Sequence, residues 1–418
     1  MAALKSFGGV GRALRNRNFR RYWFGLVIST IGFWMFRVTL GWYTWEITNS
    51  PAWLGIIGFA SLIPILVFGP IAGALSDRIG HKRVAMSSMV LSSIIAFIMA
   101  YLIATELMTI HVLFVSTTLL GCIMSFDFPA RHAMVPDLVD RKELSAAVAL
   151  NISTFHVGSF IGPIIGGYIV VEVGIAASFF VYAFTTICFF VALLFVYITP
   201  TVKSAANETV QRSTLLNDIM TGLLYLVRHP ALKWVAILNI CGALLLRPYM
   251  ELLPGYADVI FDRSVDGLSL LIAASGLGAF SGSFLLALRG KTQGLTNILL
   301  IGLSVSSISL ILFATTSHFL FGQICLFFGA LTFVGAAVCS QSLIQHKVEP
   351  HLRGRVISLI MSLVVGGMAV GSLSLGMLGE IIGLRWPIIG GAFVMLGILV
   401  FAVKPMRARA AQLEAAIT

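Results

Sequence analysis

The chain has 418 residues, of which 58% are hydrophobic and only 11% are charged. This composition excludes an ordinary water-soluble protein, because soluble monomers do not expose that much apolar surface. The net charge of +11 alone would fit a nucleic-acid-binding protein, but the positions of the basic residues point to membrane orientation instead.

The apolar residues form twelve long blocks, and a helix needs roughly 20 apolar residues to cross a bilayer. Lipid cannot satisfy exposed backbone groups, and the blocks are too long for barrel strands. We therefore predict an all-α membrane protein with twelve transmembrane helices. The predicted spans are 20–46, 53–77, 82–105, 109–130, 143–172, 176–199, 231–257, 265–289, 294–315, 318–346, 353–382 and 385–405.

The basic residues indicate how the chain is oriented. With both termini in the cytoplasm, 24 of the 28 Lys and Arg residues lie on the cytoplasmic side. The other four lie in membrane blocks or outer connections: Arg37, Arg247, Arg263 and Arg385. By the positive-inside rule, we expect a multi-pass protein of the cytoplasmic membrane with both termini inside. The basic N-terminus lacks a cleavage site, so we expect it to be retained.

A polar stretch near the midpoint divides the chain. We predict an N-terminal half over 1–199, a cytoplasmic linker over 200–230, a C-terminal half over 231–405 and a cytoplasmic tail over 406–418. Within the linker, the apolar spacing of 215–227 predicts a short amphipathic helix along the membrane surface.

The two halves share weak internal repeats, as many transporters do. The offsets are 210, 209 and 214 residues. A duplicated six-helix unit explains them, although glycines in a Gly-rich chain also align by chance. The recurring pairs are Gly32 and Arg37 with Gly242 and Arg247, Gly69 and Gly73 with Gly278 and Gly282, and Pro136 and Gly162 with Pro350 and Gly376.

A charged turn follows the second block, with the sequence Gly73-Ala-Leu-Ser-Asp77-Arg78-Ile-Gly80-His81-Lys82-Arg83. It resembles the loop 2–3 signature of the major facilitator superfamily. Gly73 would allow close helix packing, Gly80 permits the turn, and Asp77 can accept N–H groups at a neighbouring helix N-terminus. The resemblance implies the major facilitator fold, with two six-helix halves around a central cavity.

The resemblance implies that Asp77 belongs to a latch, which in that family ties the two halves together when the cavity faces outward. Arg131 and Arg355 in adjacent cytoplasmic loops are its expected charge partners. His81 departs from the usual Arg or Lys, which weakens the basic cluster without removing it. Alternatively, the basic residues of the turn only anchor the topology: Arg78, Lys82 and Arg83.

Block 5 contains Gly158-Ser-Phe-Ile-Gly162-Pro163-Ile-Ile-Gly166-Gly167. This is similar to a glycine and proline motif that the superfamily carries preferentially in exporters. Glycines four residues apart let two helices approach closely, and Pro163 bends the helix. The similarity implies export, whereas a plain packing interface would explain the same glycines.

The stretch between blocks 4 and 5 narrows the resemblance. Phe126-Asp127-Phe128-Pro129-Ala130-Arg131, followed by Pro136-Asp137-Leu138-Val139, is similar to a bacterial exporter branch that includes enterobactin-type siderophore exporters and macrolide efflux pumps. This implies an inner-membrane exporter of a siderophore-like or drug-like molecule. An importer or a lipid flippase on the same fold is the alternative.

Ionisable residues inside a bilayer are costly and indicate function. Arg37 and Arg247 occupy equivalent repeat positions, in helices that the family fold places around the cavity, and we expect them to bind an anionic substrate. Phe33, Trp34 and Trp45 share the helical face of Arg37 and suit an aromatic lining, although Trp also gathers at membrane interfaces.

Glu251 follows Arg247 by four residues, where the two can form an ion pair on one helical face. Such a pair is either permanent and structural or is opened by substrate, so that Glu251 takes up a proton and couples export to proton entry. Asp127 and Glu46 are secondary candidates for the proton path. Both lie near interfaces, where ordinary solvation is expected to explain them.

The sequence contains no phosphate-binding loop, nucleophile motif or metal-ligand cluster. Its five cysteines fall inside apolar blocks and predict neither disulfides nor a metal site. We expect that the protein is not an enzyme and uses no cofactor. We predict a monomeric secondary transporter whose partners are a small-molecule substrate, protons and the lipid bilayer.

Overall fold

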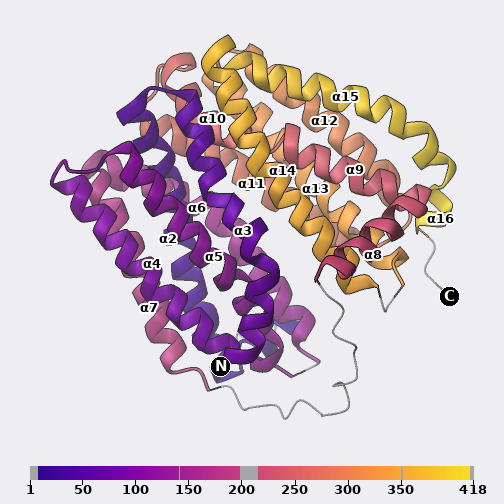
Figure 1. Cartoon of the computed structure of the whole chain (residues 1–418), viewed down its shortest axis with the longest axis horizontal. Helices are drawn as coiled ribbons and strands as arrows, with labels where there is room; N and C mark the ends of the chain where they lie inside the picture. Colours follow the sequence, from indigo (N-terminus) through magenta and orange to yellow (C-terminus); the bar gives the residue numbers. More distant parts are fainter. Residues whose placement is uncertain (1–7, 141, 198–214, 350–351, 415–418) are drawn as a thin grey trace. The chain divides into compact units, whose positions relative to one another are not determined.

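The structure is a computed structural model that describes residues 8–140, 142–197, 215–349 and 352–414. These residues form helices and short connections, and contain no strand. Twelve helical spans, one of them made of several consecutive helices, are long and apolar enough to cross a membrane (Figure 1), which confirms the predicted all-α membrane protein.

The helices follow the predicted blocks closely. In chain order they are α1 (Gly8–Ala13), α2 (Arg17–Thr48), α3 (Pro51–Ile79), α4 (His81–Ala104), α5 (Ile110–Leu138), α6 (Leu144–Glu172), α7 (Ile175–Leu194), α8 (Leu215–Arg228), α9 (Pro230–Leu245), α10 (Tyr249–Gly255), the π-helix η3 (Tyr256–Ile260), α11 (Val265–Arg289), α12 (Leu295–Thr315), α13 (Phe319–Lys347), α14 (Arg353–Ile382), α15 (Arg385–Ala408) and α16 (Ala410–Glu414).

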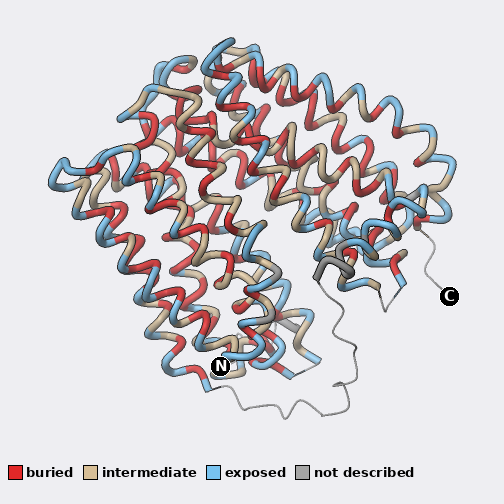
Figure 2. Tube along the Cα trace, in the orientation of Figure 1, coloured by how far each residue is buried: buried red, intermediate tan, exposed pale blue. Residues whose placement is uncertain are grey.

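The long helices bury one face and expose apolar side chains on the other. Buried and exposed positions alternate along them, as Figure 2 shows. Large exposed side chains such as Tyr168, Ile381 and Phe401 would be unfavourable in water but are solvated well by lipid. The buried faces carry many Gly, Ala and Ser residues, which let membrane helices pack closely.

The chain divides into two compact units. The first combines the residues up to Leu40 with those from Val67 to Arg212, and the second combines Gly41–Leu66 with the residues from Ser213 onward. The boundaries fall inside α2 and α3, so the adjoining ends of these two helices belong to the second unit. The division into six-helix halves at 1–199 and 231–405 stays a prediction.

The predicted amphipathic helix of the linker is confirmed as α8, Leu215–Arg228. The preceding part of the predicted linker, 200–214, lies outside the described residues.

Helix α5 is longer than the block that predicted it. The block was expected to end at residue 130, whereas α5 continues to Leu138 through Pro129 and Pro136. Each proline removes one backbone N–H donor and bends the helix without ending it here. Arg131 therefore lies inside a membrane-spanning helix and not in a loop, contrary to the prediction.

The seventh block is interrupted, although it was predicted as one span over 231–257. Helix α9 ends at Leu245 and α10 begins at Tyr249. Pro248, between them, has no N–H to donate and its ring clashes with the preceding turn of a continuous helix. Arg247 lies in this interruption, between α9 and α10, and the predicted ion pair of Arg247 with Glu251 stays a prediction.

Candidate functional site

A cavity of about 280 Å³ lies among α2, α4, α5, α6 and α7 of the first unit. Its volume is near the lower end of the roughly 300–1,000 Å³ of small-molecule pockets. Much of its wall is apolar, and five Phe and Tyr rings line it: Tyr22, Phe33, Phe128, Phe155 and Tyr182.

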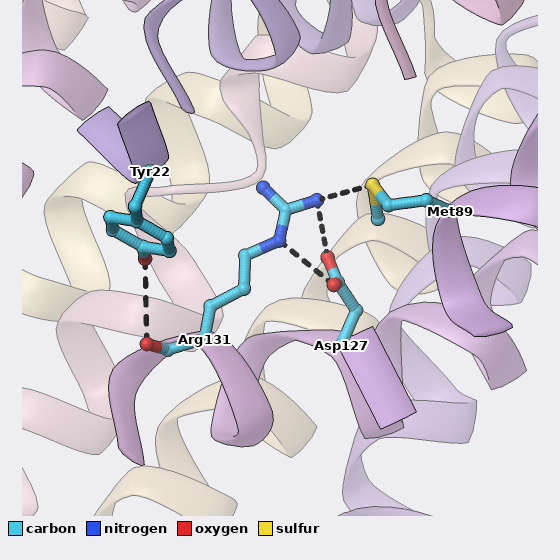
Figure 3. A network of polar contacts seen from close by, with 4 residues as sticks. All are labelled: Tyr22, Met89, Asp127 and Arg131. Atoms are coloured by element: carbon cyan, nitrogen blue, oxygen red, sulfur yellow. Dashed lines mark hydrogen bonds and ion pairs between the residues drawn. The ribbon is translucent and has the colours of Figure 1, made fainter. Parts of the chain in front are cut away.

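An ion pair between Asp127 and Arg131 stands on the wall of this cavity (Figure 3). The Arg131 Nε donates to Asp127 Oδ1 at 2.8 Å, and Nη2 lies 2.7 Å from Oδ2. The two residues are one helical turn apart on α5, with the acid preceding the base, which is the favoured order. The two parallel contacts form the bidentate geometry of a strong charge-assisted pair.

Burial of this pair overturns one expectation. Asp127 was expected to be solvated near an interface, but only 5% of it is exposed. An isolated charge at such a position would be very unfavourable, so the contact with Arg131 is what permits the ionised carboxylate. Glu46, by contrast, is exposed, as ordinary solvation predicts.

The Arg131 guanidinium is fixed by several neighbours. Its Cζ lies 4.6 Å from the ring centroid of Phe189 on α7, within cation–π range. Its Nη2 also donates to Met89 Sδ at 3.3 Å, and the Tyr22 hydroxyl donates to the Arg131 carbonyl at 3.4 Å. Among the residues drawn in Figure 3, none contacts Nη1, and Arg131 is one of the residues that line the cavity.

Asn151 on α6 adds a side-chain amide to the cavity wall. Its Oδ1 is buried and has no hydrogen-bond partner among the described residues. A buried acceptor without a partner is unfavourable and calls for a ligand or water to satisfy it. The cavity therefore offers donors at Arg131 and an acceptor at Asn151.

The glycine motif of α6 is a packing surface against α2. A Cβ on Gly158, Gly162 or Gly166 would come within 2.7, 2.6 and 3.1 Å of atoms in residues 30–35. These contacts confirm the packing interpretation of the motif, whereas its association with export stays a prediction. Two further motif residues are buried in the same helix: Pro163 and Gly167.

The three aromatic residues predicted to line one cavity lie in three different environments. Phe33 lines the cavity. Trp34 packs edge-on against Phe155, with ring centroids 5.4 Å apart. Trp45 belongs to the second unit, where its Nε1 donates to Asp258 Oδ2 at 2.9 Å.

The two predicted cavity arginines lie in different units. Arg37 is half-buried on α2 and is not among the residues that line the cavity described above. Arg247 donates through Nη1 to Met250 Sδ. Glu251 lies against Gly58 of α3, where an added Cβ would be 2.9 Å from Glu251 Cγ. A joint anion site of the two arginines, and proton uptake by Glu251, stay predictions.

The charged turn after α3 has the backbone that its sequence requires. Gly80 has φ +101°, a conformation that favours glycine. His81 Nδ1 lies 2.9 Å from Ser76 Oγ, and His81 Nε2 lies 3.5 Å from Asp77 Oδ1. Lys82 donates to the Val196 carbonyl at 2.7 Å.

Other expectations about this turn need correction or stay open. A Cβ on Gly73 would meet no atom of the described residues within 4 Å, so the expected close packing at Gly73 is not seen. Arg131, an expected partner of Asp77, forms its ion pair with Asp127. Arg355 lies in the first turn of α14. Two basic residues of the turn are exposed: Arg78 and Arg83.

The sequence interpretation missed Tyr22, Asn151 and Tyr182 as cavity residues. Each stands in an apolar block and carries no charge, so nothing marked it as functional. The available signal was Asn151, the one amide side chain in α6, because polar amides are uncommon in membrane helices and usually find a partner there.

Comparisons with known proteins identify the family of the chain. The major facilitator family model described as "Transmembrane secretion effector" matches residues 11–417. The staphyloferrin A transporter of Staphylococcus aureus is 24% identical over 362 residues, 85% of this chain and 87% of its own. The multidrug efflux pump Tap of Mycolicibacterium fortuitum is 24% identical, covering 89% and 91%. The enterobactin exporter EntS of Escherichia coli O81 is 26% identical, covering 86% and 82%.

Solved structures show the same fold. A POT family transporter in complex with 5-aminolevulinic acid has a TM-score of 0.72 at 14% identity, covering 95% of this chain and 97% of its own. The nucleoside transporter NupG has a TM-score of 0.67 at 13% identity, covering 94% and 99%. At these identities the likeness concerns the fold alone.

Proposed function

Because the chain belongs to the transmembrane secretion effector family of the major facilitator superfamily, we propose that it exports a small siderophore-like or drug-like molecule in exchange for protons. Membership makes it a multi-pass membrane transporter and not an enzyme. The observation that carries the finer proposal is the buried Asp127–Arg131 pair on the wall of a cavity within membrane-spanning helices.

The pair has no evident structural purpose. A buried ion pair contributes little net stability, because desolvating two charges offsets most of their attraction. Apolar side chains of similar volume would hold α5 in place equally well. Charged groups that persist inside a membrane segment are therefore best explained by a role in transport.

The polar groups suggest which substrates fit. Arg131 Nη1 suits an anionic or strongly polar acceptor, such as a carboxylate, catecholate or hydroxamate oxygen. Asn151 Oδ1 suits a hydroxyl or N–H donor of the same molecule. The five rings of the wall suit a planar or apolar portion. Chelating siderophores combine these groups, and two relatives carry siderophore names.

The geometry of the pair supports the proposed proton coupling. The ionised Asp127 orients Arg131 through two contacts, so protonating Asp127 removes the partner that aims the guanidinium at the substrate. Proton and substrate then oppose each other at one site, as antiport requires. Major facilitator proteins move by alternating access around such a site.

The charge pattern supports the proposed orientation in the membrane. We propose an inner-membrane location in a bacterium, with both termini cytoplasmic and a monomeric protein. An importer or a lipid flippase on the same fold is the alternative.

Transport into everted membrane vesicles tests the proposal. With an acid interior, the wild-type protein should accumulate enterobactin, staphyloferrin A or the dye ethidium, and an uncoupler should abolish the accumulation. Asp127→Asn should insert normally but lose the dependence on the pH gradient, because an amide cannot exchange a proton at this site. Glu172→Gln makes the same chemical change at an exposed position and should behave as wild type.

Two outcomes would contradict the proposal. Accumulation that is equally pH-dependent in Asp127→Asn would exclude this carboxylate as the coupling group. Substrate movement only out of everted vesicles, or movement of a fluorescent phospholipid alone, would favour the importer or the flippase.

A further inference from the structure

Helix α8 exposes a continuous row of apolar side chains. Four large residues, each between 43% and 55% exposed, form this apolar stripe: Met220, Leu223, Leu224 and Val227. Their spacing of i, i+3, i+4 and i+7 places them on one face of the helix. Apolar side chains gathered on one exposed face are unfavourable in water, so the stripe indicates a surface that an apolar phase or a partner covers.

The other sides of α8 are held by the second unit. The helix packs against α9 and α14 (Figure 1), and its Leu226 is buried. The Tyr225 side chain lies beside Glu349, in the connection from α13 to α14. The Tyr225 ring also lies against His229, with centroids 4.1 Å apart, and His229 Nδ1 is 2.9 Å from the Tyr225 carbonyl oxygen. These contacts fix the rotation of α8, so that the stripe faces away from them.

The position of α8 along the chain places the stripe at the level of the membrane surface. The helix ends at Arg228, and the apolar span Leu232–Ile260 begins four residues later. At no more than about 3.6 Å per residue, the end of α8 lies within roughly 14 Å of the start of that span. Trp234, half-buried in the first turns of α9, is of the residue type that gathers at membrane interfaces. An amphipathic helix at this depth buries its apolar face at the boundary between headgroups and acyl chains.

The chain around α8 is basic. Residues 215–234 and 345–356 contain five Lys and Arg residues against two acids, Asp218 and Glu349. An acidic phospholipid surface attracts each nearby Lys or Arg strongly enough to favour binding about five-fold. Three of the basic residues are exposed: Arg228, Lys233 and Arg353. The other two are Lys347 and Arg355.

Lipid fits this surface better than a protein partner does. The stripe, its packing contacts and the basic residues all belong to the second unit, so the surface is complete without the first. The span that follows α8 already brings lipid to this level. An apolar face bordered by cations matches the two parts of an acidic phospholipid, the acyl chains and the phosphate-bearing headgroup. A neutral lipid would match the stripe but not the cations.

We propose that α8 is a docking surface for acidic phospholipid of the cytoplasmic leaflet, with the apolar stripe among the acyl chains and Arg228, Lys233 and Arg353 at the headgroup phosphates. The cytoplasmic side follows from the predicted topology, in which α8 belongs to the linker between the halves. The surface shares no residue with the cavity and needs no substrate, so it is independent of the proposed export.

Quenching by brominated lipid tests whether the stripe lies in the bilayer. In a full-length protein whose native cysteines are replaced by serine, Leu224→Cys carries the dye bimane, and the protein is placed in nanodiscs of equal parts phosphatidylglycerol and phosphatidylcholine. Brominated acyl chains should quench this bimane strongly, and iodide in the buffer should quench it weakly. Ile308→Cys, at an exposed position within α12, is the lipid reference, and Lys291→Cys, in the connection before α12, is the aqueous reference.

The same dye tests the preference for acidic lipid. The composition is kept constant, and only phosphatidylglycerol or only phosphatidylcholine is brominated. Quenching at Leu224 should show a local enrichment of phosphatidylglycerol of about five-fold or more, whereas Ile308 should show little. Arg228→Gln with Lys233→Gln should remove most of this enrichment. The matched control, Lys404→Gln with Arg407→Gln, makes the same change at two exposed residues near the end of α15 and should leave the enrichment unchanged.

Several results would overturn the proposal. Quenching at Leu224 that matches Lys291 would put the stripe in water, and protection from both quenchers would mean that protein covers it. Equal quenching by the two lipids would show contact with lipid but no selection of acidic headgroups. If the double glutamine variant fails to insert, salt replaces it as the test. Potassium chloride at about 0.5 M should lower the enrichment at Leu224 severalfold by screening the cations, and an unchanged enrichment would exclude recognition by charge.

Discussion

Two membrane segments each place an acid and an arginine four residues apart, and the structure treats them differently. In α5, Asp127 and Arg131 meet at 2.7 Å on a helix that continues through Pro129. In the seventh block, the chain breaks between α9 and α10, and Arg247 donates to Met250. Equal spacing in the sequence therefore occurs in two different backbone settings, inside a continuous helix in α5 and across an interruption in the seventh block.

The difference follows from where proline stands relative to the pair. Pro129 lies between Asp127 and Arg131, and α5 continues through it while both side chains line the same cavity. Pro248 directly follows Arg247 and coincides with the interruption, and the order of charges is also reversed. An acid that precedes its base by four residues is favoured by the helix dipole, whereas the opposite order is weaker.

Removing each arginine would sharpen this comparison most strongly. Arg131→Ala leaves Asp127 as an unpaired buried carboxylate, so we expect a loss of about 3–5 kcal/mol in the free energy of unfolding. Arg247→Ala should cost less, because Arg247 and its neighbour Glu251 are only half-buried. Denaturant titration in mixed micelles measures both.

The double variant Arg131→Ala with Asp127→Asn provides the control. It removes the stranded charge and should recover much of the lost stability, since both partners are then neutral. Equal destabilisation by Arg131→Ala and Arg247→Ala would contradict the expected difference between the two segments. Transport of an anionic probe that depends on Arg37 and Arg247, but not on Arg131, would move the substrate site away from the described cavity.

The surroundings of Glu251 allow a test of intermediate size. Gly58→Ala brings a Cβ to 2.9 Å from Glu251 Cγ and 3.1 Å from Ser372 Cβ. We expect a loss of roughly 1–3 kcal/mol in the free energy of unfolding from overpacking. Gly69→Ala on the same helix meets no described atom within 4 Å and should be neutral or slightly stabilising.

A further substitution identifies the atoms responsible. Combining Gly58→Ala with Glu251→Ala should relieve the collision, so the double variant should lose less stability than the two single losses together. Strict additivity would show that Glu251 does not occupy the position beside Gly58. In that case the double-variant cycle would indicate that Glu251 does not pack against α3.

The smallest effect concerns a carboxylate at the surface of the second unit. Glu414 accepts from the N–H groups of Gly294 and Thr296 at the start of α12, at 2.6 and 3.0 Å. Burial acts to raise the pKa of the Glu414 carboxyl, but these hydrogen bonds outweigh it and lower the pKa below the ordinary 4.5. The group is mostly solvated, so its contribution to stability is small.

The sign of the pH dependence follows from that shift. A depressed pKa in the folded protein stabilises it fully above about pH 4.5, and the contribution is lost as the pH falls through the folded-state value. Glu414→Gln should therefore lower the thermal midpoint slightly at pH 7, and the difference from wild type should shrink steadily as the pH is lowered below about 4.5. A difference that grows on acidification would refute this.

Much of the fold was predictable because the signal for membrane spans is local. Runs of apolar residues specify a crossing wherever they occur, and all twelve predicted blocks correspond to long apolar helices. The prediction of helix boundaries was wrong where the local composition does not indicate whether the backbone is helical. The residues from Arg131 to Leu138 were predicted as part of a loop but continue α5, and the apolar residues around Pro248 were predicted as one helix but are interrupted.

The site was less predictable, because it depends on side chains that distant parts of the chain bring together. The sequence by itself determined the crossings, the family and the presence of Asp127 and Arg131. Only the tertiary structure decided that Asp127 is buried, that Asn151 stands on the same wall, and that Glu380 caps a helix that begins more than 300 residues earlier. Hydropathy is a sum over neighbours in the chain, whereas desolvation and hydrogen bonding depend on neighbours in space.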